Sequence, residues 1–199
     1  MTKYILHGGD IRNSSDEGKA FFTDMVDGLV LKPKVLMCFF AQPKSIWNDK
    51  YMEWRVRIAA SVPRYSVQFG MADLKDFKEQ SEKYDVLFVY GGDASMLIEA
   101  LRSLGNYREV LDRFKVVAGS SAGAIMLSKF GWDCNERKVV EGLGFVPAKV
   151  LVHFESETYG KVDDRGPIDW QKAWDEMAAF DDPALPILEL HEGEFESYG

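Results

Sequence analysis

The chain has 199 residues, of which 46% are hydrophobic and 13% aromatic, and this composition is typical of one globular domain. The formal net charge of -8 argues against a nucleic-acid partner, because phosphate backbones are bound by basic surfaces. No apolar run approaches the roughly 20 residues that span a bilayer, and the apolar run near the start is too short for a secretory leader. Cys38 and Cys134 lie in unrelated settings, so we expect a reduced, cytoplasmic protein.

The first 120 residues alternate between apolar runs and helical patterns. The runs expected to form buried strands are residues 4–6, 35–41, 66–69, 86–90 and 115–118. Between them, Ser14 and Glu17 have the spacing of a capping box, residues 47–58 carry apolar side chains at helical spacing, and Asp93 could cap a helix ended by Gly105. The alternation predicts an α/β fold, with a parallel-rich central sheet and helices on both faces.

The C-terminal third has a different pattern. Pro167 and Asp169 precede a helical pattern, and two short strands are expected at residues 187–191 and 194–198, around the turn Glu192-Gly193. No linker-like stretch separates this part from the rest. We therefore expect residues 1–199 to form a single domain.

Three of the expected strands end in sequences suited to a functional site. These are H-G-G-D at residues 7–10, G-G-D at residues 91–93 and G-S-S-A-G at residues 119–123. In open α/β sheets, sites gather at the carboxyl ends of the strands. The three sequences are therefore the candidates for such a site.

Residues 119–123 match G-x-S-x-G, the pattern of a nucleophile elbow. An apolar strand precedes the pattern and a helix is expected over residues 122–130, ended by Gly131. The pattern selects Ser121 as the nucleophile and leaves Ser120 at the variable position. The amide of Ala122 would then face a bound oxyanion from the start of the helix. A plain Gly/Ser-rich turn is the alternative, and the strand–turn–helix context favours the elbow.

Residues 91–93 could supply a second oxyanion donor. Glycine lets the backbone approach a ligand closely, which makes the amide of Gly92 a candidate. The alternative is a strand-to-helix turn with Asp93 as its N-cap. Both can hold together, because the cap uses a side chain and the donor is a backbone amide.

A serine nucleophile needs a base and an acid that orients it. The chain has three histidines, His7, His153 and His191, and the apolar stretch before His153 favours it modestly. The interval between serine and histidine holds three carboxylates, among which the residues alone do not choose: Asp133, Glu136 and Glu141.

The order of these motifs resembles the family of dipeptidase E and cyanophycinase. The resemblance covers residues 86–155 and rests on V-Y-G-G-D, on G-S-S-A-G-A, and on G-L-G-F-V-P leading to His153-Phe154. It implies a class I glutamine-amidotransferase-like (flavodoxin-like) fold with a serine–acid–histidine order.

The resemblance also implies roles for single residues. Ser121 becomes the nucleophile, His153 the base and Asp133 the acid, with Glu136 as its rival, while Gly92 and Ala122 become the oxyanion donors. Asp93 and Arg165 are the residues expected to bind substrate. Dipeptidase E recognises an N-terminal aspartate with an arginine, and the sequence around Arg165, D-D-R-G-P, departs from the family pattern.

We therefore expect a serine hydrolase, an exopeptidase or dipeptidase that cleaves small peptides, with aspartyl peptides as candidate substrates. The alternatives are a cyanophycinase-like hydrolase of isoaspartyl peptides and a non-catalytic binding module on the same fold. A glutamine amidotransferase would need a cysteine where Ser121 stands, and a lipase-type hydrolase is usually longer. No cofactor or metal is expected, because the histidines lack ligand spacing. The expected partner is a small peptide substrate, and no binding to nucleic acid or to a membrane is expected. The sequence leaves open whether the chain forms a homodimer.

Overall fold

The first of two sheets forms the centre of the molecule. The computed structural model describes residues 1–14, 16, 18–159 and 165–199. Its six-stranded sheet has the order β10-β1-β5-β4-β2-β3, in which β10 is antiparallel to β1 and the other pairs are parallel. The strands are β1 (Lys3–His7), β2 (Lys34–Cys38), β3 (Gln68–Met71), β4 (Val86–Val89), β5 (Val116–Ser120) and β10 (Phe195–Tyr198).

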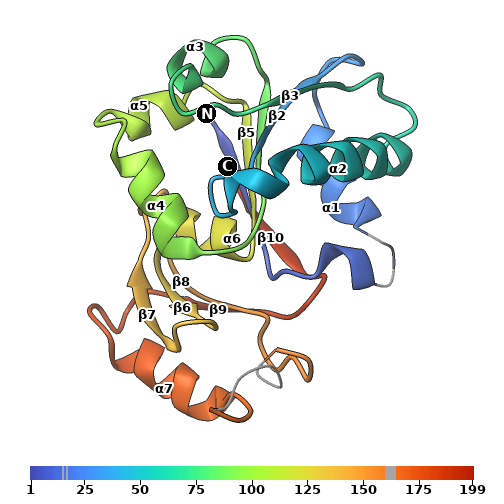
Figure 1. The fold of residues 1–199 in the computed structure, drawn as a ribbon. Helices are drawn as coiled ribbons and strands as arrows, with labels where there is room; N and C mark the ends of the chain where they lie inside the picture. The colour runs from blue at the N-terminus through green and yellow to red at the C-terminus, as the bar shows by residue number, and fades with distance from the viewer. Residues whose placement is uncertain (15, 17, 160–164) are drawn as a thin grey trace.

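Helices cover both faces of this sheet (Figure 1). Alternate residues of a strand point to opposite faces, so Val35 and Met37 of β2 pack with α1 (Lys19–Val26) and α2 (Trp47–Ser61). Leu36 and Cys38 belong to the core on the other face. The helices that contribute to that core are α3 (Phe77–Ser81), α4 (Ala94–Arg102), α5 (Tyr107–Leu111) and α6 (Ala122–Leu127). Two short 3-10 turns, η1 (Ile11–Asn13) and η2 (Lys44–Ile46), precede α1 and α2.

A second, four-stranded sheet follows the elbow and was not predicted. Its order is β7-β6-β8-β9, formed by β6 (Ser128–Asp133), β7 (Lys138–Glu141), β8 (Val146–Val152) and β9 (Ile187–Leu190). The helix α7 (Trp170–Ala179) packs on it at the lower end of the molecule (Figure 1). The prediction of a helix over residues 122–130 is therefore wrong at its end, because Ser128 already pairs with Val146 of β8.

The G-L-G sequence at residues 142–144 explains why the chain turns so early. The amides of these three residues donate to the carbonyl oxygens of Lys129, Met126 and Ser128. A Cβ on Gly142 would lie 2.1 Å from the oxygen of Ser128, so only glycine fits against this turn. The segment thus holds the end of α6 and the start of β6 by its own backbone.

Several other local predictions can be compared with the structure. The five expected strands and the two C-terminal strands are confirmed, with shifted ends. Asp93 caps α4 and Asp169 caps α7, each through its side chain. Ser14 accepts a hydrogen bond from the amide of Gly18, while its expected capping-box partner Glu17 lies outside the described residues. Within the described part of the chain, no helix combines the length and the apolar character of a membrane span.

Candidate active site

Ser121 occupies a strained turn between β5 and α6. Its backbone has φ 53° and ψ −109°, a conformation that residues with side chains rarely adopt. Its amide donates to the carbonyl oxygen of His7 at 2.9 Å. A Cβ on Gly119 would lie 2.3 Å from the oxygen of Gly123, so the chain can turn this sharply only with glycine at position 119. These are the features of a nucleophile elbow.

His153 lies directly after β8 and reaches across to Ser121. Its Nε2 is 3.0 Å from the Ser121 Oγ, and the residue is buried. The ring stacks on Tyr159, with centroids 4.1 Å apart and an angle of 23° between the planes. The amide of His153 donates to the oxygen of Gly8 at 2.8 Å. The position of the imidazole is therefore held by the backbone hydrogen bond of His153 to Gly8 and by the stacking of its ring on Tyr159.

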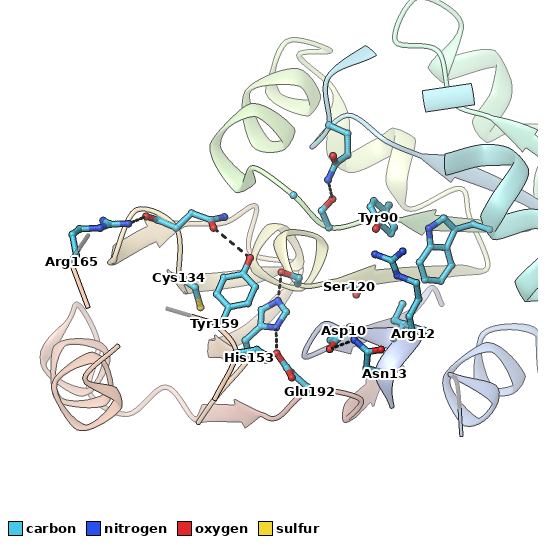
Figure 2. A pocket seen from close by; sticks show the side chains of 18 residues that line it. Asp10, Arg12, Asn13, Tyr90, Ser120, Cys134, His153, Tyr159, Arg165 and Glu192 are labelled. Carbon is cyan, nitrogen blue, oxygen red and sulfur yellow. Dashed lines mark hydrogen bonds and ion pairs between the residues drawn. The ribbon is translucent and has the colours of Figure 1, made fainter. Parts of the chain in front are cut away.

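The carboxylate that contacts His153 belongs to Glu192, in the turn after β9. Its Oε1 is 3.1 Å from the Nδ1 of His153 (Figure 2). The same oxygen accepts a hydrogen bond of 2.7 Å from the Ser156 hydroxyl. The hydrogen bond with His153 lowers the pKa of Glu192, so this group is a carboxylate at neutral pH. A carboxylate can only accept, so Nδ1 carries the proton and Nε2 is left to accept from Ser121.

The acid predicted from the sequence does not reach the imidazole. The Oδ1 of Asp133 accepts instead from the amides of Asn135 and Glu136, and desolvation raises the pKa of this carboxyl group. Glu136 lies 3.5 Å from the amino group of Lys138, and Glu141 lies 3.7 Å from the guanidinium of Arg102. The preference for Asp133, and its alternatives, are corrected to Glu192, because Glu192 alone of these carboxylates contacts His153.

The position of Glu192 follows from the second sheet. Val152, just before His153, pairs with Leu190, two residues before Glu192, in the parallel ladder of β8 and β9. The carboxyl ends of neighbouring parallel strands meet at one edge, which brings the two side chains together. The sequence predicted the strand and the turn, but it did not predict that β9 pairs with β8.

The two residues expected to be oxyanion donors, Gly92 and Ala122, lie in backbone segments that flank Ser121. Ala122 is the first residue of α6, where amides lack a partner within the helix. A Cβ on Gly91 would lie 3.1 Å from the Cβ of Ser121, which shows how closely the loop of Gly91 and Gly92 approaches the serine. Within the described residues, the amides of Gly92 and Ala122 have no protein acceptor.

The backbone of His7-Gly8-Gly9 is hydrogen-bonded to Ser121, to His153 and to the turn that carries Glu192. His7 and Gly8 accept from the amides of Ser121 and His153, and Gly9 accepts from Gly193 at 3.0 Å. A Cβ on Gly9 would lie 2.2 Å from the Cε1 of His153. This segment therefore connects the edge of the first sheet to His153 and to the turn of Glu192, which both follow strands of the second sheet.

The other two histidines have different surroundings. His7 is buried, and its Nδ1 accepts from the amide of Gly9 at 2.9 Å. Burial, together with the nearby His153, lowers the pKa of His7 to about 3, so it is neutral at neutral pH. His191 packs its ring against Phe154, with centroids 5.4 Å apart. Of the three histidines, His153 alone makes a hydrogen bond to the Ser121 hydroxyl.

A cavity of about 770 Å³ opens above Ser121. Asp10, Arg12 and Tyr90 line it on one side of His153, and Tyr159 and Arg165 on the other (Figure 2). Arg165 donates to the backbone oxygen of Asn135 at 2.6 Å. The expectation that Asp93 binds substrate is not supported by its position, because its exposed side chain caps α4 and does not line the cavity.

No candidate metal site accompanies the cavity in the described part of the chain. Groups of three or more His, Cys, Asp or Glu side chains that could hold an ion are absent there. Cys38 and Cys134 are both buried and free.

Comparison with known proteins gives a family match and a set of structural neighbours. The sequence model of peptidase family S51 matches residues 62–195, more than half of the chain. The fold is similar to that of a peptidase from an acI-B1 Actinobacterium (TM-score 0.63, 18% identity), with 100% of this chain and 83% of that chain covered. It is also similar to a peptidase E-type protein from Listeria monocytogenes EGD-e (TM-score 0.64, 15% identity), with 98% and 93% covered. A search of curated proteins found no match.

Proposed function

The chain belongs to peptidase family S51 and is a peptidase, and we propose that it hydrolyses small peptides through Ser121, His153 and Glu192. The observation that carries the proposal is the continuous pair of hydrogen bonds from the serine hydroxyl through the imidazole to the carboxylate, at 3.0 and 3.1 Å. Such an arrangement activates serine because the hydroxyl proton has a base to receive it.

In the proposed reaction, the Ser121 Oγ attacks the scissile carbonyl carbon while its proton moves to the Nε2 of His153. The amides of Gly92 and Ala122 stabilise the negative charge that develops on the carbonyl oxygen. His153 then gives the proton to the leaving amine as the C–N bond breaks. A water molecule, deprotonated by the same nitrogen, attacks the carbonyl carbon of the acyl-serine. As the ester bond breaks, His153 returns this proton to the Ser121 Oγ and the carboxylic acid product is released. Glu192 stabilises the imidazolium formed in each half of the reaction.

We further propose that the enzyme is an exopeptidase or dipeptidase. The cavity of about 770 Å³ lies within the usual size range of sites that take small ligands. Its lining carries charges of both signs. Asp10 and Arg12 lie on one side of the cavity and Arg165 on the other, an arrangement that suits a short peptide with charged ends. Arg165 supports the choice of aspartyl peptides as candidate substrates. A panel of dipeptides with Asp, isoaspartyl or neutral first residues tests this choice by comparing kcat/KM.

The experiment that tests the nucleophile is covalent labelling with a fluorophosphonate. The wild-type enzyme should react at Ser121, and Ser121→Ala should lose both labelling and peptide hydrolysis while keeping its circular dichroism spectrum. Ser120→Ala is the matched control. Its hydroxyl is buried and lies 3.4 Å from His7, so this variant should retain most activity. A folded wild-type protein that neither reacts nor hydrolyses any peptide would instead be a binding module.

A further inference from the structure

The peptide bond between Gly91 and Gly92 lies between Ser121 and the side chain of Gln42. On the serine side, a Cβ on Gly91 would be 3.1 Å from the Ser121 Cβ. On the opposite side, a Cβ on Gly92 would be 2.2 Å from the oxygen of Ala41 and 2.4 Å from the Nε2 of Gln42. The peptide is thus in close contact on both sides, and glycine is required at position 92, where φ is 146° and an added Cβ would overlap Ala41.

Gln42 makes one directed contact with this peptide. Its Nε2 donates to the carbonyl oxygen of Gly91 at 2.6 Å. The backbone of Gln42 is itself held, because its amide donates to Phe39 at 2.9 Å and its oxygen accepts from the Trp47 indole at 2.9 Å. The following amide, that of Asp93, donates to Ala41 at 2.9 Å. The loop is therefore held at the Gly91 oxygen by Gln42 and at the amide of Asp93 by Ala41.

The orientation of the Gly92 amide follows from this contact. The described chain has no cis peptide bond, and in a trans peptide the C=O and the following N–H point in opposite directions. Since the oxygen of Gly91 points to Gln42, the N–H of Gly92 points away from it. Gln42, Gly91, Gly92 and Ser121 all line the same cavity, so this N–H is presented to the space beside the serine.

We propose that Gln42 is a positioning residue, which holds the Gly91–Gly92 peptide so that the Gly92 amide stabilises the oxyanion. The inference rests on the proposed function and adds to it a residue that acts through another. A donor fixed in advance stabilises the transition state without reorganising during the reaction. Without Gln42, two adjacent glycines have many accessible backbone conformations, and the peptide could rotate and present its oxygen to the developing negative charge.

The test compares two Gln42 variants with a control elsewhere in the fold. Gln42→Met keeps the length of the side chain and removes the donor, and Gln42→Glu places a carboxylate against the Gly91 oxygen. Gln80→Met is the control, because the Nε2 of Gln80 also donates to a backbone oxygen, that of Met71 at 3.0 Å, outside the cavity. The readouts are kcat and KM for a peptide that the wild type cleaves, the Ki of a peptide aldehyde, and the rate of fluorophosphonate labelling.

We expect kcat and the labelling rate of Gln42→Met to fall about 10- to 100-fold. This decrease is at most about as large as the decrease in kcat when a whole oxyanion donor is removed. KM should change less than twofold, and aldehyde binding should weaken by the same factor as kcat, because the adduct also carries an oxyanion. Gln42→Glu should lose more than Gln42→Met. Gln80→Met should keep wild-type kcat even if its melting temperature drops.

Two results would overturn the role of Gln42 while leaving the proposed function intact. One is wild-type kcat in both Gln42 variants, and the other is a raised KM with unchanged kcat, which would make Gln42 a substrate contact. If Gln42→Met does not fold, the similar shape of Gln42→Glu keeps the comparison available. Absence of labelling and hydrolysis in the folded wild type would overturn the proposed function together with this inference.

Discussion

Two residues of the candidate active site, Ser121 and His153, have a backbone φ of 53°. Residues held in such conformations cost on the order of 1–3 kcal/mol each and persist where neighbouring interactions hold them. Here the neighbours are the oxygens of His7 and Gly8, which accept from the two amides. With both residues in these conformations, the serine hydroxyl and the imidazole Nε2 lie 3.0 Å apart, the contact on which the proposed chemistry depends.

At the residue scale, the first prediction concerns the acid. Glu192→Gln keeps the shape but removes the charge that stabilises the imidazolium, so kcat should fall by about 10³- to 10⁴-fold, as for loss of a triad acid. Asp133→Asn, at the position favoured by the sequence, should change kcat only a few-fold. Steady-state kinetics on a cleaved dipeptide measures both. A severe loss in Asp133→Asn with a near-silent Glu192→Gln would contradict the assignment.

The second prediction concerns the buried His7. Its pKa is about 3 in the folded protein, against 6.5 for an unperturbed histidine, so between these values the unfolded chain binds a proton that the folded chain does not. Folding stability should therefore fall as the pH drops from about 6.5 toward 3, by up to about 1.4 kcal/mol per pH unit for one proton.

The variant His7→Asn removes this titration and keeps an acceptor near the amide of Gly9. Its free energy of unfolding in urea should depend less on pH than that of the wild type when measured at about pH 7.5 and about pH 5. His191→Asn, in which a partly exposed histidine is removed, should keep the wild-type pH dependence. Equal pH dependence in all three proteins would show that His7 does not control it.

At the scale of elements, the segment after β1 determines the geometry of the site. His7 at the end of β1 accepts from the amide of Ser121, Gly8 after it accepts from the amide of His153, and Gly9 accepts from the turn that carries Glu192, through hydrogen bonds of 2.8 to 3.0 Å. The sequence H-G-G-D was recognised as a strand end of interest, yet its contribution is made by backbone oxygens and by the absence of side chains. Glycine is required here because the imidazole occupies the space of a side chain at position 9.

The third prediction tests this segment. Gly9→Ala places a methyl group where it would lie 2.2 Å from the His153 ring, at a backbone φ of 114°. The ring must move, and a displacement of about 1 Å from the productive geometry can cost on the order of 100-fold in rate. The control is Gly28→Ala, which has φ 74° but no atom within 4 Å of the added Cβ.

Both glycine variants should lose some stability from backbone strain, but only Gly9→Ala should lose fluorophosphonate labelling. Labelling rates and thermal unfolding, measured side by side, separate the two effects. Comparable labelling in the two variants would mean that the ring tolerates the methyl group.

At the scale of the whole molecule, the candidate active site lies where the two sheets meet. Ser121 follows β5 of the first sheet, His153 follows β8 of the second, and Glu192 lies in the connection from β9 to β10, which returns to the first sheet (Figure 1). The distances within the site therefore depend on how one sheet is held against the other.

The fourth prediction tests this dependence. Removing residues 195–199 deletes β10, whose ladder with β1 runs from Tyr4 to His7, and exposes the edge of β1. It also removes Phe195, whose ring is 5.8 Å from that of Phe21. We expect a lower melting temperature and slower labelling, although all the proposed catalytic groups remain in the chain.

The matched control for this truncation removes Gly199 alone, which should leave both quantities near the wild-type values. Differential scanning fluorimetry and labelling rates provide the measurements. A truncated protein with wild-type labelling would show that β9 and the second sheet position Glu192 without β10.

The sequence by itself determined the features that depend on neighbouring residues. The strands of the first sheet and β9, the caps at Asp93 and Asp169, and the turn around Ser121 follow from apolar runs, capping side chains and glycine spacing, all of which act within a few residues. These local rules predicted the strands of the first sheet, selected Ser121 and favoured His153 modestly, while the resemblance to the dipeptidase E family implied the same two residues as nucleophile and base.

Tertiary structure decided the features that require distant segments to meet. Glu192 became the partner of His153 because β9 pairs with β8, and β6 replaced the end of an expected helix because its residues pair with β7 and β8. Strand pairing is set by the burial of whole faces and leaves little signal in any single stretch of chain. The contacts of Gln42 and Gly9 have the same origin, since each depends on a backbone that the fold brings close from elsewhere in the sequence.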